Sequence, residues 1–185
     1  RRQRQMCIRD SFTILSSCAS RQLEEVTFRR TVIPVQELLD AAGKYFKKLM
    51  KNRSERIELE IEPMEAKVIG DVNQLRFLLE NLIDEALTVR EDGVIRLQAR
   101  KDNEYIRFLF TDTRREKSVE ELNQLFYPNL ARMTSGEKGE LRGTEYLVCK
   151  QIIRDHDEFA GRRGCRINAE PAEGGGFTVY FTIPR

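Results

Sequence analysis

The sequence offers four candidate site residues, which are Asn81, Glu85, Asp112 and Gly143. Asn81 and Glu85 are four residues apart, so on a helix they share one face. Asp112 follows an apolar run typical of a strand, and Gly143 precedes the last helical pattern. A carboxylate such as that of Glu85 is able to bind Mg²⁺. An aspartate after a strand is also a common turn or capping residue, so residue types alone leave the role of Asp112 open.

The segment that carries Asn81 and Glu85 runs from residue 71 to residue 86. Its apolar residues recur at i, i+3, i+4, i+7, i+8 and i+11, which predicts an amphipathic helix. They are Leu75, Leu78, Leu79, Leu82, Ile83 and Ala86. Asp71 is suited to cap this helix, and Gln74 stands where it would complete a capping box. The pattern alone fits equally a core helix that packs on a sheet and carries no site residue.

The rest of the chain predicts elements that would hold this helix. Alternation and turn residues indicate strands over 25–31, 56–62, 66–70, 94–101, 104–111, 165–170 and 177–184. Apolar spacing and capping residues indicate further helices over 8–24, 34–50, 118–126 and 143–159, with a polar loop over 127–142. Ser118 and Glu121 form a second capping box. This order predicts an α+β fold, a two-layer sandwich of helices on one face of a mixed β-sheet, preceded by a helix.

Length and composition narrow the classes of protein. A chain of 185 residues is expected to form one domain, or one with an appendage. The net charge of +2 gives no strong attraction to nucleic acid or anionic lipid, and no apolar run is long enough to span a membrane. Four scattered cysteines and a single histidine argue against a zinc site and favour reduced thiols in a cytosolic setting. Because the first residue is Arg1, we expect a piece of a longer protein.

The first predicted helix carries a short coiled-coil pattern. Ile8, Phe12, Leu15 and Ala19 follow alternating steps of four and three. A helix of this length is marginal alone in water, so it needs a partner within the chain or in a second copy. The alternative is an ordinary helix packed on its own domain.

The segment Asn81-Leu-Ile-Asp-Glu85-Ala86 resembles the asparagine-box helix, N-L-L-x-N-A, of sensor histidine kinase ATP-binding domains. That family shares an ATPase superfamily with gyrase, Hsp90 and MutL. The resemblance covers about residues 20–185. It implies that the second asparagine of the box, which coordinates Mg²⁺, is replaced here by Glu85. Thr88 replaces the basic residue that usually reaches the phosphates. Arg90 and Lys138 would supply that positive charge instead.

Two further boxes of the family are matched in part. The D-x-G-x-G box, whose aspartate would accept a hydrogen bond from the adenine amino group, is matched at Asp112, but Arg114 and Glu116 replace its glycines. Its usual interval leads to a phenylalanine box at Leu125-Phe126.

In the G-x-G-x-G box, whose backbone N–H groups would hold phosphates, Gly143 is the one matching glycine. Leu141 and Glu145 replace the others. His156 matches the family's histidine before the last hairpin, although a surface or capping role is the more ordinary interpretation.

The resemblance implies two segments and two competing functions. Residues 1–25 would be the end of a dimerisation-type helix, and residues 26–185 a histidine kinase-like ATPase domain. The first hypothesis is a degenerate, pseudokinase-like ATP-binding domain of a two-component sensor histidine kinase, acting in signal transduction by docking and dimerisation. The alternative is an active but divergent histidine kinase or ATPase. In both hypotheses no catalytic residue is assigned in this chain, because the phosphorylatable histidine lies upstream.

Cofactor and partner expectations follow from the same resemblance. Asn81, Glu85, Asp112 and Gly143 would contact ATP, with Glu85 on Mg²⁺, but ATP and Mg²⁺ binding are expected to be weak or absent. The expected partners are a second copy, through the N-terminal helix, and a response regulator or other domains of the full-length sensor. The expected location is the cytoplasm, either in a separate protein or in the cytoplasmic part of a larger membrane sensor. A nucleic-acid-binding module is disfavoured because no basic stripe interleaved with aromatic residues appears.

Overall fold

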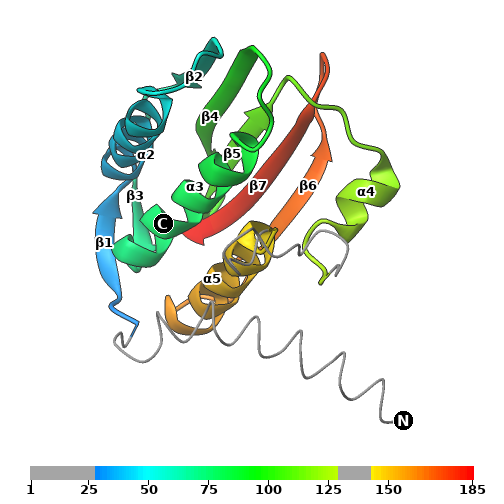
Figure 1. Cartoon of the computed structure of the whole chain (residues 1–185). Coiled ribbons are helices and arrows are strands. Elements are labelled where there is room, and N and C mark those ends of the chain that lie inside the picture. Colours follow the sequence, from blue (N-terminus) through cyan, green and yellow to red (C-terminus); the bar gives the residue numbers. More distant parts are fainter. Residues whose placement is uncertain (1–27, 129–142) are drawn as a thin grey trace, which may run out of the picture.

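The computed structural model describes residues 28–128 and 143–185. The strands are β1 (Thr31–Pro34), β2 (Ile57–Ile61), β3 (Lys67–Gly70), β4 (Gly93–Asp102), β5 (Tyr105–Asp112), β6 (Ile167–Pro171) and β7 (Phe177–Pro184). The helices are α2 (Val35–Met50), α3 (Val72–Ala86), α4 (Val119–Gln124) and α5 (Glu145–Phe159). The order of elements is the predicted one (Figure 1).

The main sheet has five strands in the order β2-β4-β5-β7-β6, and β1 pairs with β3 in a separate two-stranded sheet. The pair β2 and β4 is parallel, and the other neighbours in the main sheet are antiparallel. The helices α2, α3 and α5 lie side by side on one face of the main sheet (Figure 1). This arrangement confirms the expected α+β fold with helices on a mixed sheet.

The core lies between the helical layer and the sheet. Phe108 of β5 and Phe181 of β7 are register partners, and their rings stack with centroids 4.9 Å apart. The predicted apolar residues of α3 face this layer and are buried, as are alternate residues of β4, β5 and β7. Alternation along β4 and β5 therefore places one side of these strands in the core, as the sequence pattern predicts, whereas nearly all of β7 is buried.

The N-terminus of α3 is capped, but not by the predicted capping box. The Asp71 carboxylate accepts hydrogen bonds from the N–H groups of Asn73 and Gln74. The Gln74 side-chain oxygen is buried without a hydrogen-bond partner. The Asp71 N–H that it was expected to satisfy donates instead to Nε2 of His156, at 3.1 Å. The capping-box prediction for Gln74 is wrong because the side chain of His156, 85 residues after Asp71, takes its place.

His156 is fully buried, so the surface interpretation is wrong, whereas its contact with the Asp71 N–H at the N-cap of α3 is a capping role. Its Nδ1 lies 2.8 Å from the carbonyl oxygen of Ile152, and Phe28 packs edge-on against the ring. Because Nε2 accepts from Asp71, Nδ1 carries the proton and donates to Ile152. Burial lowers the pKa of His156, with Ile152 and Asp71 acting in the opposite direction.

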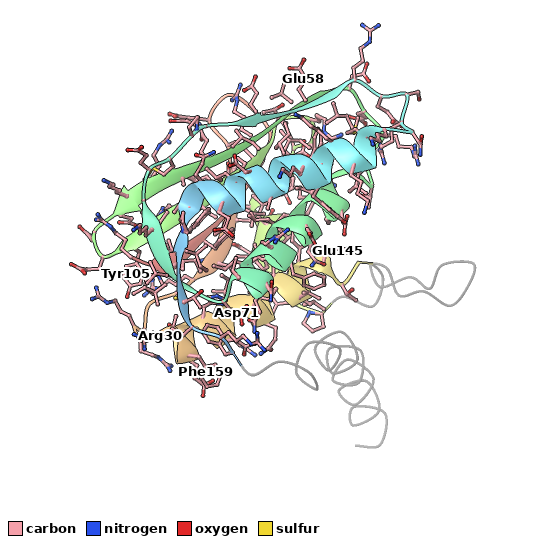
Figure 2. All side chains as sticks on the ribbon, turned by 90° about the vertical axis from the view of Figure 1, so that its left-hand side faces the viewer. Arg30, Glu58, Asp71, Tyr105, Glu145 and Phe159 are labelled. Carbon is pink, nitrogen blue, oxygen red and sulfur yellow. The ribbon has the colours of Figure 1, made fainter. Side chains whose placement is uncertain are left out.

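The chain enters the domain beside this histidine. The backbone N–H of Arg29 donates to the Asp71 carboxylate at 2.9 Å. Figure 2 shows Asp71 near Arg30 and Phe159, at one end of the helical layer. The strand expected at residues 25–31 is misplaced, since β1 begins at Thr31 and residues 28–30 have no regular structure. The predicted helix over 8–24 and residues 129–142 of the predicted loop lie outside the described residues. No described helix is long and apolar enough to cross a membrane.

Candidate functional site

The predicted site residues converge where the C-terminal end of α3 meets the end of β5 and the start of α5. Asp71 at the start of α3 contacts His156 near the end of α5, so the two helices run antiparallel. This direction brings Glu145, at the start of α5, toward Glu85 near the end of α3. Asp112 is the last residue of β5. Binding of a nucleotide by Asn81, Glu85, Asp112 and Gly143 stays a prediction.

The carboxylate of Asp112 is buried, with a side chain 1% exposed, and accepts four hydrogen bonds from its own chain. Oδ1 accepts from the backbone N–H and from Nε of Arg114, each at 3.0 Å. Oδ2 accepts from Nη2 of Arg114 at 3.0 Å and from Nε of Arg115 at 3.1 Å. Two carboxylate oxygens offer about four acceptor positions, so Asp112 has no unused hydrogen-bonding capacity.

Arg114 stands where the sequence resemblance expects the first glycine of the D-x-G-x-G pattern, and its side chain is 1% exposed. Besides its bidentate contact with Asp112, it donates from Nη2 to the Ala86 carbonyl oxygen at 2.6 Å. Nη1 donates to the carbonyl oxygens of Val89 and Glu91, at 3.0 and 2.9 Å. All five N–H donors of the guanidinium therefore have acceptors, which is the complete inventory of an arginine.

Gly93 provides the space in which Arg114 lies. A Cβ atom at Gly93 would stand 2.5 Å from Cγ of Arg114, closer than real Cβ contacts. The φ angle of Gly93 is +148°, in the region that favours glycine. Gly93, the first residue of β4, thus forms a wall of the site.

Arg115 connects Asp112 with Glu85. Its Nη1 lies 3.4 Å from Oε1 of Glu85, and its guanidinium lies over the Phe177 ring at 5.5 Å. Burial alone would lower the pKa of Arg115, but Glu85 and Asp112 raise it. Tyr146 is hydrogen-bonded to Glu85, and its burial followed by the Glu85 charge raises its pKa well above the ordinary value.

Acidic residues gather at the other end of the site. Burial raises the pKa of Glu145, and the charges of Glu85 and Asp84 raise it further. Asp84 accepts a hydrogen bond from the Tyr45 hydroxyl at 2.6 Å. Gly143 has a φ of +83°, and within the described residues no side chain makes a capping hydrogen bond at the N-terminus of α5. Within the described ranges, no three His, Cys, Asp or Glu side chains are arranged to hold a metal ion.

The other sequence candidates are held by local contacts. Asn81 is buried and donates from Nδ2 to the Phe77 carbonyl oxygen at 2.7 Å, inside its own helix. Thr88 donates to the Glu85 carbonyl oxygen at 2.6 Å. The exposed side chain of Arg90 pairs with Glu55. Lys138 and Leu141 lie outside the described residues.

Sequence reasoning missed Arg115, Tyr146 and Gly93. The run Asp112-Thr-Arg-Arg contained a signal, because two arginines beside a strand-terminal aspartate are suited to pair with it. Nothing in the sequence indicated that Tyr146 meets Glu85, since that contact depends on the packing of α5 against α3. Leu125 and Phe126 of the predicted phenylalanine box are buried, and Phe126 lies edge-on to Tyr146.

The class of protein follows from a comparison with known families. The model of the histidine kinase-, DNA gyrase B- and HSP90-like ATPases matches residues 70–185. The chain belongs to this family. No curated protein matches the chain.

Solved structures of histidine kinases have the same fold. The nucleotide-free catalytic domain of histidine kinase ThkA is 19% identical with a TM-score of 0.64, over 84% of this chain and 97% of that one. The mycobacterial sensor histidine kinase MprB is 18% identical with a TM-score of 0.64, over 84% and 97%. The Acinetobacter baumannii histidine kinase AdeS is 14% identical with a TM-score of 0.60, over 95% and 75%.

Proposed function

We propose that this chain is a degenerate, pseudokinase-like ATP-binding domain of a two-component sensor histidine kinase. It acts in signal transduction by docking and dimerisation, and it binds ATP and Mg²⁺ weakly or not at all. The proposal combines the family membership with the contacts made by Asp112. The family supplies the expectation of a nucleotide, and the contacts of this chain argue against it.

One observation carries the proposal: the Asp112 carboxylate is saturated by Arg114 and Arg115. The resemblance assigns that carboxylate to the adenine amino group. An incoming adenine would have to displace an arginine that is itself buried and fully hydrogen-bonded. The residues at this end of the site therefore do not fit ATP.

The size of that obstacle follows from the energetics of buried ion pairs. Breaking such a pair by removing one partner costs about 3–5 kcal/mol, because the other charge stays buried. Each 1.4 kcal/mol is a factor of about ten in affinity. Displacing Arg114 would therefore weaken ATP binding by roughly two to three and a half orders of magnitude. A site with micromolar affinity would then bind ATP too weakly to function.

The charges at the other end act in the same direction. Glu145 stands where the resemblance expects a glycine near the triphosphate, and Glu85 and Asp84 lie close enough to raise its pKa. A carboxylate close to a phosphate costs on the order of 1 kcal/mol in a partly screened site. Glu85, the expected Mg²⁺ ligand, is itself engaged by Arg115 and Tyr146.

The second candidate is an active but divergent kinase, with Asn81 and Glu85 toward Mg²⁺·ATP, Asp112 on adenine and Gly143 at the phosphates. Its support is the family membership and the link that Arg115 makes between Asp112 and Glu85. It requires Arg114 and Arg115 to leave Asp112 when nucleotide arrives. The second candidate therefore predicts a rearrangement on ATP binding that the first does not.

Docking partners are proposed from the same setting. ThkA has been crystallised in complex with the response regulator protein TrrA, and this chain matches that kinase with 19% identity and a TM-score of 0.65. We propose a response regulator or other domains of a longer sensor as partners, and homodimerisation through residues 1–25. The proposed location is the cytoplasm, where such sensors meet their regulators.

Isothermal titration of the whole chain with Mg²⁺·ATP tests the proposal. No saturable heat is expected up to millimolar nucleotide. An ATP-binding histidine kinase domain, titrated in the same buffer, is the positive control. A dissociation constant in the low micromolar range for this chain would defeat the pseudokinase proposal and favour the divergent kinase.

A further inference from the structure

The geometry points to a guanidinium site at the end of α3 that the chain fills with its own Arg114. We define this guanidinium site by the Asp112 carboxylate and the carbonyl oxygens of Ala86, Val89 and Glu91. We propose that the Arg114 guanidinium in this site holds together the end of α3, the segment after it and the end of β5 in the absence of nucleotide. This inference rests on the proposed function, because it names what replaces the nucleotide.

The acceptors of the guanidinium site come from separate segments. Ala86 is the last residue of α3, Val89 and Glu91 lie in the following turn, and Asp112 ends β5. Their oxygens lie 2.6–3.0 Å from the nitrogens of one guanidinium. The C-terminal carbonyls of a helix have no partner within the helix and carry its negative dipole end. A cation at this place donates hydrogen bonds to these carbonyl oxygens and offsets the negative end of the helix dipole.

The site is specific for the guanidinium shape. Two parallel N–H···O bonds to a carboxylate need a planar fork, which an ammonium group lacks. Three more planar donors reach the three carbonyl oxygens. Gly93 leaves room for the aliphatic part of Arg114, since a Cβ there would meet Cγ and Cδ of Arg114 at 2.5 and 3.0 Å. The ligand class is therefore a monosubstituted guanidinium.

Chemical rescue of Arg114→Ala tests this inference. Methylguanidinium at low millimolar concentration is expected to raise the melting temperature of the variant in a saturable manner. Methylammonium, which has the same charge without the fork, is expected to have no such effect. The matched control is Arg96→Ala, whose arginine pairs with Glu60 on the exposed side of the sheet. Neither the control nor the unmodified chain is expected to gain stability from methylguanidinium.

A measurement on the unmodified chain applies if Arg114→Ala does not fold. The Nε and Nη protons of Arg114 are expected to give separate, slowly exchanging NMR signals, assigned by their loss in Arg114→Lys. Averaged and rapidly exchanging signals would overturn the inference. Equal rescue by methylammonium, or an Arg114→Ala chain as stable as Arg96→Ala, would overturn it too.

The two proposals fail separately. If methylguanidinium does not rescue Arg114→Ala while the unmodified chain still ignores Mg²⁺·ATP, the guanidinium site is wrong and the proposed function stands. If the unmodified chain binds Mg²⁺·ATP at micromolar concentration, the proposed function is wrong whatever the rescue shows.

Discussion

The guanidinium of Arg114 and the carboxylate of Asp112 form a buried bidentate pair, with Nε–Oδ1 and Nη2–Oδ2 both 3.0 Å long. One residue separates the two in the sequence, and both side chains are almost fully excluded from solvent. A pair of this kind is stable only when every donor and acceptor has a partner, which is the case here. The contact places an arginine at a position where the sequence resemblance expects a glycine.

Replacing Arg114 by alanine is expected to destabilise the domain by about 3–5 kcal/mol, because Asp112 would be left buried with one remaining arginine. Three backbone carbonyls would also lose a donor, although that of Ala86 would keep the Val89 N–H. Urea unfolding followed by circular dichroism measures the loss. The control Arg96→Ala removes an exposed pair worth about 0–1 kcal/mol. A loss for Arg114→Ala no larger than that of the control would contradict the assignment.

Replacing Glu145 by glutamine is expected to stabilise the domain at pH 7 by up to about 1 kcal/mol. Burial and the charges of Glu85 and Asp84 raise the pKa of Glu145, so its ionisation costs stability. The carboxyl ionises at lower pH in the unfolded chain, and stability falls as pH rises from about 4.5 toward the folded pKa. The first-turn position favours a negative charge, but the raised pKa means that this effect does not prevail.

Unfolding of Glu145→Gln at pH 7 and at pH 3.5 checks this prediction. The gain is expected at pH 7 and absent at pH 3.5, where the carboxyl is protonated in both states. Glu58→Gln, on an exposed position of β2, changes net charge equally and serves as control. A gain that persists at pH 3.5 would show that charge is not its cause.

Acidification below about pH 6.5 is expected to destabilise the domain through His156. Burial lowers the pKa of His156, so the unfolded chain binds the proton more readily than the folded one. Stability present above the ordinary histidine pKa is then lost as pH falls, by up to about 1.4 kcal/mol per pH unit. His156 is the single histidine of the chain, which makes the assignment direct.

Unfolding between pH 8 and pH 6, with His156→Gln for comparison, measures this slope. Glutamine has an oxygen able to accept from the Asp71 N–H and does not titrate. The variant is expected to be less stable at pH 8 but flatter with pH. Equal slopes for both chains would remove His156 as the titrating group.

Replacing Leu15 by glutamate is expected to abolish homodimerisation. The residue lies in the coiled-coil pattern of the predicted N-terminal helix, where a charge is costly to bury. Sedimentation velocity of both chains at several concentrations measures the dimerisation, with Ser17→Glu as a control outside the pattern. A monomeric parent chain would contradict the proposed interface.

The fold was largely predictable because its signals are local. The capping box at Ser118 and Glu121 is present as predicted, and the alternation of β7 places its predicted apolar residues in the core. The cap of α3 was predicted only in part, since local pattern cannot reveal that His156 takes the Asp71 N–H.

The sequence indicated candidate residues for the site but not the contacts that these residues make. The replaced glycines indicated added bulk and charge. The five donors of Arg114 meet acceptors from α3, the following turn and β5, and that convergence depends on tertiary packing. The role of Gly93 depends on the same packing.

The affinity of the whole chain for Mg²⁺·ATP tests the central claim most directly, measured beside Arg114→Gly/Glu116→Gly, in which both replaced glycines return. We predict no saturable binding by the unmodified chain at millimolar nucleotide, and tighter binding by the folded double variant. Micromolar binding by the unmodified chain would contradict the claim that its own arginines occupy Asp112 in place of adenine.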